Sequence, residues 1–257
     1  MFKSTTTNMN GGVTNAASFQ TMGFSGVPDP TYAHVVEDDF DAYITSKWVL
    51  SGTGAVTPTV SSTTDGGAIT LTTGAVAADS TVIQSAGGMI LNPAGGKAAF
   101  FKVAASMASV GTTGFYAGWI NEGAALSAPV SGIYFELAVG GANLLVQQAV
   151  GSTVTTLMTL PNPFTDNVMV ELGLAVDSLG NLAAYVNPTT GKSGYARNAP
   201  SPLGVATGNP SLGYDALVAA SKVTYPVGAL SPTVGILTAS AAAQTALVDF
   251  LVAVRER

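Results

Sequence analysis

The chain has few residues that could act as a nucleophile or a metal ligand. It contains one histidine, His34, and no cysteine, so zinc thiolate sites and cysteine nucleophiles are excluded. A Ser-His-Asp arrangement would have to use His34, which has acidic neighbours from Glu37 to Asp39. No Gly-x-Ser-x-Gly motif accompanies it, although a nucleophile elbow needs one. We therefore expect His34 to be a solvated or interface residue.

Five acidic residues lie close together near the start of the chain: Asp29, Glu37, Asp38, Asp39 and Asp41. Closely spaced carboxylates can bind Ca²⁺. The run from Asp38 to Asp41 does not fit the Asp-x-Asp-x-Asp-Gly loop, and in an extended segment Asp38 points away from Asp39 and Asp41. We expect a solvated strand start, with calcium as the alternative. The sequence assigns no metal ligand and no cofactor.

Most glycoside hydrolases use a pair of carboxylates as catalytic residues. Glu136 and Glu171 lie within predicted strands, and Glu122 lies at a strand end. Each of the two mid-strand acids is alone on its strand, opposite an aliphatic row. A jelly-roll glucanase needs an acidic motif such as Glu-x-Asp-x-x-Glu on one strand, and the sequence has none. We therefore assign no catalytic residue and predict that the protein is not an enzyme. A degenerate glycoside hydrolase using Glu136 and Glu171 is kept as a third hypothesis.

Aromatic residues offer a second kind of chemistry, because sugar rings stack on aromatic faces. Trp48, Tyr116, Trp119 and Tyr134 could form such a platform, although aromatic residues in a sandwich more often fill its core. With the nearby acids, they define a candidate glycan face of Trp119, Tyr134, Glu136 and Glu171.

One segment superficially resembles a phosphate-binding loop. Asn187 to Ser193 ends in Gly-Lys-Ser, but Val186 stands where the first glycine is required. No helix is predicted to follow, as a P-loop needs. We interpret the segment as a turn after a strand.

The elements that must position these residues are strands. Ile133, Phe135 and Leu137 share one face of a predicted strand, and alternation recurs from Val168 to Val176. Strands recur about every 8 to 12 residues, a spacing typical of an all-β sandwich or jelly roll. We predict an antiparallel β-sandwich over residues 37–257, closed by strands at 233–237 and 246–254. Residues 187–232 hold six of the thirteen prolines and predict a loop-rich insertion.

Residues 1–36 form a distinct segment rich in Thr, Asn, Gly and Ser, without a sustained helix or strand period. Its spaced aromatic residues suit an extended arm that orders on a neighbouring molecule, because a solvated tail has no need of them. The candidate interface residues of this arm are Phe2, Phe19, Phe24 and Tyr32.

The composition excludes several partners. Of 257 residues only 9% are charged, the net charge is −6, and mean hydropathy is +0.40. Nine Lys and Arg residues cannot neutralise many phosphates, so we predict no nucleic-acid partner. The best membrane-span candidate, residues 239–254, is interrupted by polar residues, and the N-terminus has no apolar signal region, so we predict no membrane partner. So few charges favour a surface partly covered by other subunits.

Several features of the sequence occur together: Asp38-Asp39-Phe40, Trp48, the long strands around Phe100 and Trp119, the hairpin Val168 to Val186 and the closing run Val248 to Val254. With them the chain resembles the concanavalin A-like lectin/glucanase sandwich over about residues 37–186 and 233–254. The resemblance implies a jelly-roll fold in which the closing strand returns beside the first strand. The sequence lacks both the acidic strand motif of the family's hydrolases and the metal loop of its legume lectins.

The whole chain is also similar to virion proteins of tailed bacteriophages in its cysteine-free, Thr/Gly/Ala/Val-rich composition and its polar arm. Within that group it looks most like a capsid decoration, or cement, protein, because no long amphipathic helix of a major capsid protein is present. This resemblance implies a structural protein on the virion surface, made in the host cytoplasm. Its partners would be the major capsid protein and itself, as a homodimer or homotrimer. The alternative is a glycan-binding module of a phage tail or head fibre, with a surface glycan as partner.

Overall fold

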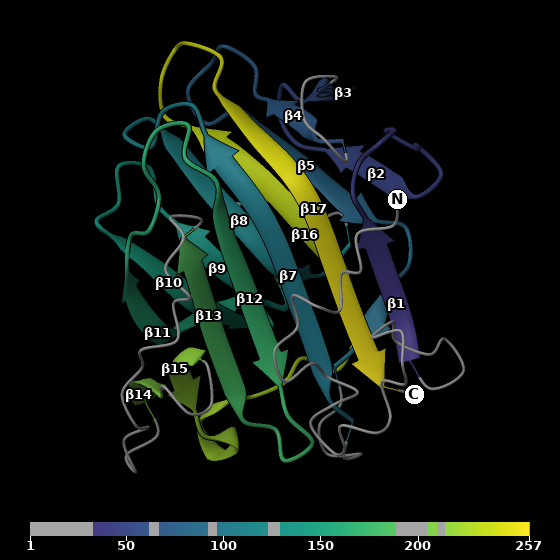
Figure 1. Cartoon of the computed structure of the whole chain (residues 1–257), viewed down its shortest axis with the longest axis vertical. Coiled ribbons are helices and arrows are strands. Elements are labelled where there is room, and N and C mark those ends of the chain that lie inside the picture. Colours follow the sequence, from purple (N-terminus) through teal and green to yellow (C-terminus); the bar gives the residue numbers. More distant parts are fainter. Residues whose placement is uncertain are drawn as a thin grey trace.

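The computed structural model describes residues 33–61, 67–91, 97–122, 129–188, 205–209 and 214–256. These residues form two antiparallel sheets that stack face to face, as Figure 1 shows, so the predicted all-β sandwich is confirmed. One short 3₁₀ helix, η4 (Ala220–Lys222), accompanies the strands. Within this described part, no helix is long and apolar enough to cross a bilayer. The predicted arm residues Phe2, Phe19, Phe24 and Tyr32 lie outside it.

The nine-stranded sheet, called sheet A, has β17 near its centre, paired with β7, β4 and β1. The closing strand therefore returns beside the first strand, as the lectin-like resemblance implied. In spatial order, sheet A consists of β14 (Val205–Asn209), β15 (Tyr214–Val218), β13 (Leu182–Pro188), β12 (Val170–Val176), β7 (Ala99–Met107), β17 (Thr245–Glu256), β4 (Ile69–Thr72) and β3 (Val56–Val60), with β1 (Ala33–Asp38) on β17.

The eight-stranded sheet, called sheet B, has β8 and β16 at its centre. In spatial order it consists of β11 (Thr153–Pro161), β10 (Asn143–Val150), β9 (Gly132–Leu137), β8 (Thr113–Ile120), β16 (Ala229–Thr238), β5 (Ser80–Ser85) and β2 (Trp48–Ser51), with β6 (Met89–Ile90) on β16.

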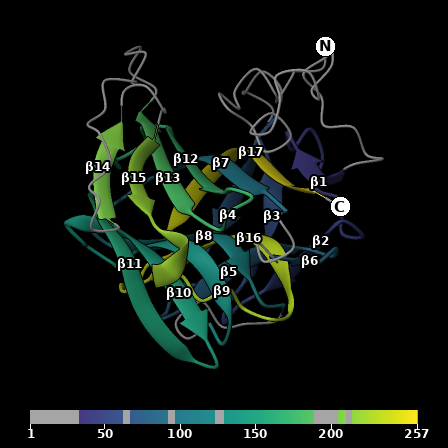
Figure 2. The same ribbon diagram turned by 90° about the horizontal axis from the view of Figure 1, so that it is seen from below.

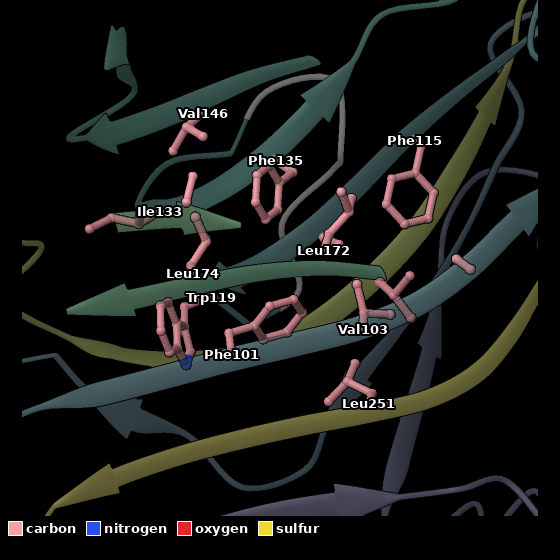
Figure 3. Packing of buried hydrophobic residues seen from close by; sticks show 14 of the residues in the cluster. Phe101, Val103, Phe115, Trp119, Ile133, Phe135, Val146, Leu172, Leu174 and Leu251 are labelled. Carbon is pink, nitrogen blue, oxygen red and sulfur yellow. The ribbon is translucent and has the colours of Figure 1, made fainter. Parts of the chain in front are cut away.

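The core lies between the two sheets and is built from alternate residues of each strand. Ile133 and Phe135 of β9 point inward from sheet B, and Leu172 of β12 points inward from sheet A, as Figure 3 shows. All three are essentially inaccessible to solvent. Phe101 and Trp119 connect the sheets by an edge-on contact with ring centroids 5.7 Å apart. The period-two pattern of the sequence thus determined which side chains are buried here.

The closing strand departs from simple alternation. In β17 the register against β7 shifts between Val248 and Phe250, which marks a β-bulge at Asp249. Val248 and Leu251 therefore both belong to the core, although an unbroken alternation places them on opposite faces. The extra residue at Asp249 reverses the direction of every β17 side chain that precedes it.

The proline-rich segment contains more sheet than its prolines suggested. Strands β14 and β15 lie within it and extend sheet A beyond β13. Pro232 even lies inside β16, paired with Trp119 of β8. On the other side of β16, Pro232 falls between the residues that pair with β6 and those that pair with β5. The missing N–H donor of Pro232 therefore removes no hydrogen bond from the pairing of β16 with β5.

The first strand is fixed to the second sheet by a carboxylate. Asp38 Oδ2 accepts a hydrogen bond from Trp48 Nε1 at 2.6 Å and lies 3.0 Å from Lys47 Nζ. Its Oδ1 accepts from the backbone N–H of Phe40 at 2.9 Å. Asp38 is a buried tether rather than a solvated strand start. This contact gives a physical reason for the Asp-Asp-Phe and Trp pairing seen in the sequence.

Candidate functional site

The outward face of sheet B carries the polar residues that could bind a ligand. Phe115 and Phe135 point into the core, so their strand neighbours Tyr116, Tyr134 and Glu136 point away from it. Tyr116 and Glu136 are directly opposite each other on β8 and β9. The sheet register, rather than sequence proximity, brings these three residues together.

Tyr116 and Glu136 form the central contact of this face. The Tyr116 hydroxyl donates to Glu136 Oε1 at 3.2 Å, and the Tyr116 and Tyr134 rings have centroids 6.3 Å apart. Burial raises the pKa of both tyrosines, and the negative charge of Glu136 raises it further. Both hydroxyls therefore stay protonated at neutral pH. Glu136 itself is only half-buried, so its second oxygen can reach a ligand.

Amide and hydroxyl groups extend the face on both sides. On β10, Gln147 lies opposite Tyr134, and its Oε1 accepts a hydrogen bond from the exposed Thr156 Oγ1 at 3.0 Å. On the other side, Gln84 Nε2 donates to Thr233 Oγ1 at 3.0 Å and to the backbone oxygen of Asn121 at 3.2 Å. The turn after β8 thus folds toward Gln84, and the more accessible part of the face lies around Glu136 and Thr156.

A glycine in the middle of β8 permits the close approach of β9. Gly118 has φ +154°, and a Cβ there would lie 2.5 Å from the backbone oxygen of Ile133 and 2.6 Å from Tyr134 Cα. No side chain fits at that distance. Gly118 therefore sets the spacing that places Tyr134 beside Tyr116.

The structure does not bring the two predicted tryptophans to this face. Trp119 comes three residues after Tyr116 on β8 and therefore lies on the opposite face of the sheet. It points into the core against Phe101, as Figure 3 shows. Trp48 is also in the core, where its ring packs on Phe40 with centroids 5.4 Å apart. Of the aromatic platform proposed from the sequence, only Tyr116 and Tyr134 lie outward, because strand parity separates them from Trp119.

Glu171 lies on the other side of the molecule. It points outward from β12 in sheet A and pairs with Lys102 of β7 at 2.8 Å. Glu136 points outward from sheet B, so the hydrophobic core lies between the two carboxylates. They cannot face one another across a cleft, as the two carboxylates of a glycoside hydrolase must. Glu136 and Glu171 therefore cannot act as the carboxylate pair of the hydrolase hypothesis.

The remaining predicted residues are also placed. His34 is exposed on β1, opposite Arg255 of β17. Among the described residues, no group of three or more acids or histidines gathers closely enough to hold a metal ion.

The polar residues that flank the two tyrosines on this face were not predicted from the sequence. Gln147, Thr156 and Gln84 are ordinary polar residues of strands, and nothing in their local sequence distinguishes them. If the strand order β10-β9-β8 were known, Gln147 could be identified, because Gln147 lies opposite Tyr134 in the register. That order is a tertiary property.

The arrangement can form hydrogen bonds in both directions with little charge. Hydroxyl, amide and carboxylate groups line the outward face, and Glu136 is the only charged residue in the strands of sheet B. No lysine or arginine lies in these strands. Such a surface suits a neutral, polyhydroxylated ligand better than an anion.

No family model matches the sequence, and no curated protein matches it. Solved structures do match the fold. Arcelin-5, a lectin-like defence protein from Phaseolus vulgaris, has a TM-score of 0.58 at 9% identity and covers 88% of this chain and 100% of its own. The carbohydrate recognition domain of Emp47p has a TM-score of 0.56 at 11% identity, covering 88% and 97%. The exoplasmic/lumenal domain of VIP36, in a Ca²⁺/Man3GlcNAc-bound form, has a TM-score of 0.55 at 8% identity, covering 86% and 87%. The chain therefore has the concanavalin A-like lectin fold.

Proposed function

We propose that this protein is a glycan-binding module and that its binding face is the outward side of sheet B around Glu136. The observation that carries the proposal is the cluster of Tyr116, Glu136, Gln147 and Thr156, which joins hydroxyl, carboxylate and amide groups on one face. The fold shared with lectin-like domains supports the same function.

Each group has a role in the proposed complex. The free oxygen of Glu136 accepts from sugar hydroxyls, which gives charge-assisted hydrogen bonds. Thr156 and Gln147 supply further hydroxyl and amide groups at the accessible edge. Tyr116 holds the Glu136 carboxylate in place through its 3.2 Å hydrogen bond.

The proposal assigns no residue to calcium. The VIP36 structure is a Ca²⁺-bound form. In the part of this chain that the structure describes, the acids do not gather into a set of metal ligands, and Asp38 is already occupied by Trp48 and Lys47. Repeating the binding measurement with Ca²⁺ and with a chelator shows whether a metal contributes.

The charge on this face sets the expected specificity. Because Glu136 is the only charge in the strands of sheet B, the local potential is negative and repels sialylated or uronic sugars. Neutral and amino sugars are favoured.

The test is binding to an immobilised set of neutral, amino and sialylated oligosaccharides, followed by titration of the best ligand. Replacing Glu136 by Ala is expected to weaken binding about tenfold, or about 1.4 kcal/mol. Thr156→Val should weaken it less. Asp41→Ala is the matched control, because Asp41 is an exposed acid outside sheet B and should leave affinity unchanged. Absence of binding to every sugar, or equal affinity in the Glu136→Ala variant, contradicts the proposal.

Capsid decoration stays a prediction from the composition and the arm. The partners expected for it were the major capsid protein and a second or third copy of this chain, and the described residues contain no contact that bears on them. The measurement is the copy number per purified phage particle, by quantitative mass spectrometry against the major capsid protein. Hundreds of copies support a shell component, whereas a handful support a tail or fibre module.

A further inference from the structure

The outward face of sheet A carries a larger apolar cluster than that of sheet B. Its residues come from β1, β17, β7, β12 and β13 and form a cluster separate from the core. Phe100 and Tyr185 contact each other across Gly173, with ring centroids 6.3 Å apart. The cluster, called the apolar outer face, consists of Ala33, Val35, Ala98, Phe100, Ala175, Tyr185, Phe250, Val252 and Val254.

The residues of this face are shielded from solvent although they point away from the core. Val254 is 0% exposed and Val252 is 2% exposed. Side chains on the open face of a solvated sheet are normally accessible, and one such face of an antiparallel sheet is usually polar. A cover over this face would account for the burial of these side chains.

A buried ion pair lies on the same face. Lys102 points outward between Val252 of β17 and Gly173 of β12, yet its side chain is only 9% exposed. Its Nζ lies 2.8 Å from Glu171 Oε2 and 5.1 Å from the centre of the Phe250 ring. Lysine is rarely this buried unless it is paired, as Lys102 is with Glu171.

None of the described strands or helices covers this face. Figure 2 shows sheet A with β1, β17, β7, β12 and β13 side by side and no described element stacked on their outer side. Sheet B packs on the opposite, inner side. Any cover must therefore come from elsewhere.

The described chain begins at this face. Ala33, the first residue of β1, belongs to the apolar cluster, and Val35 lies opposite Val254 in the register. The 32 preceding residues are therefore attached at the edge of the face. Fully extended, they could span roughly 100 Å, whereas five adjacent strands are about 20 Å wide.

We propose that the apolar outer face is the docking surface for residues 1–32 of the same chain. This segment contains only two charged residues, Lys3 and Asp29, and its aromatic residues are spaced along it. Phe2, Phe19 and Phe24 supply side chains for the apolar surface. Its many Thr and Asn residues supply acceptors for Lys102, whose ammonium group has three donors. The segment thus completes its own sandwich instead of bridging to a neighbour.

The experiment uses the absence of cysteine, because a single introduced thiol then reports on one position. Val252→Cys is made in the full chain and in a chain that starts at residue 33, and the rate of maleimide labelling is compared. Val103→Cys, in the core, is the protected control, and Ser178→Cys, in an exposed turn, is the reactive control.

In the full chain we expect Val252→Cys to react at least tenfold more slowly than Ser178→Cys. Removal of residues 1–32 should raise its rate at least tenfold and leave both controls unchanged. If the shortened chain does not fold, a Phe19→Ser/Phe24→Ser variant of the full chain should expose Val252→Cys but not Val103→Cys.

Two results would overturn the proposal. If Val252→Cys stays protected without residues 1–32, another part of the chain covers the face. If protection in the full chain is lost on hundredfold dilution, a second copy covers it. The glycan-binding proposal concerns the other sheet, so its success or failure is independent of this outcome.

Discussion

Each outward face of the sandwich carries an apolar cluster, but the two faces differ in their polar groups. The outward face of sheet A is mostly apolar and holds a largely buried ion pair, Lys102 with Glu171. That of sheet B carries tyrosine, amide and threonine groups around a single half-exposed carboxylate, Glu136. Both sheets share one core, so the core does not explain the difference. The two proposals made above assign a permanent cover to sheet A and a polar ligand to sheet B.

The sharpest test of this comparison uses one glycine from each face. At Gly118 of sheet B a Cβ would lie 2.5 Å from a backbone oxygen, whereas at Gly173 of sheet A the nearest atom would be 3.4 Å away. Gly118→Ala should therefore cost about 3 kcal/mol of unfolding free energy, because β9 must shift. Gly173→Ala should change it by less than about 1 kcal/mol.

Urea unfolding of the two variants measures the contrast. The Gly118→Ala variant should also lose sugar binding, because a shift of β9 displaces Tyr134 and Glu136. Equal destabilisation by the two substitutions would show that strand spacing in sheet B is not set by Gly118.

The buried ion pair gives the next largest effect. Glu171→Leu leaves the Lys102 ammonium unpaired and should cost about 2 kcal/mol. Lys102→Met should cost less, because the Glu171 side chain is 20% exposed and can be solvated. The double variant should be close to the unmodified protein in stability.

Measuring the same substitutions in a chain without residues 1–32 tests whether that segment covers sheet A. The cost of Glu171→Leu should then fall, because water reaches Lys102. A cost that does not change would mean that the cover of sheet A does not depend on the N-terminal segment.

The smallest effect concerns the hydroxyl face at high pH. An unfolded tyrosine loses its proton near pH 10.0, whereas burial and Glu136 raise the pKa of Tyr116 in the native state. Above pH 10 the native state therefore binds more protons than the unfolded state, and stability falls as pH rises. Below pH 10 the contribution of Tyr116 is complete.

Replacing Tyr116 by Phe should reduce this alkaline loss by about 1 kcal/mol between pH 10 and pH 11. Unfolding free energies across that range, with tyrosinate absorbance as a second signal, measure it. An unchanged slope would mean that Tyr116 is accessible to water in the native protein.

The strand pattern made much of this fold predictable. Alternation alone placed Ile133 and Phe135 on one face of a strand, and in the structure that face lies in the core. The return of β17 beside β1 followed from the resemblance carried by Asp38-Asp39-Phe40 and Trp48. Local periodicity is enough for these features because side-chain direction in a strand has a period of two.

The glycan face was only partly predictable. Tyr134 and Glu136 were named together, and their strand parity places them both outward. Trp119 and Glu171 were included because they are aromatic or acidic and lie on strands. Nothing local to those residues says which sheet, or which side of it, they occupy.

The sequence by itself determined the class of fold, the inward rows of each strand and the apolar, weakly charged character of the chain. Tertiary structure decided which strands are neighbours, and that decision brought Tyr116, Glu136 and Gln147 together and separated Glu136 from Glu171. Tertiary structure also decided which face each side chain of β17 occupies, through the bulge at Asp249. The physical reason is that alternation fixes a side chain's direction relative to its own strand, whereas register and sheet order arise from pairing between distant segments.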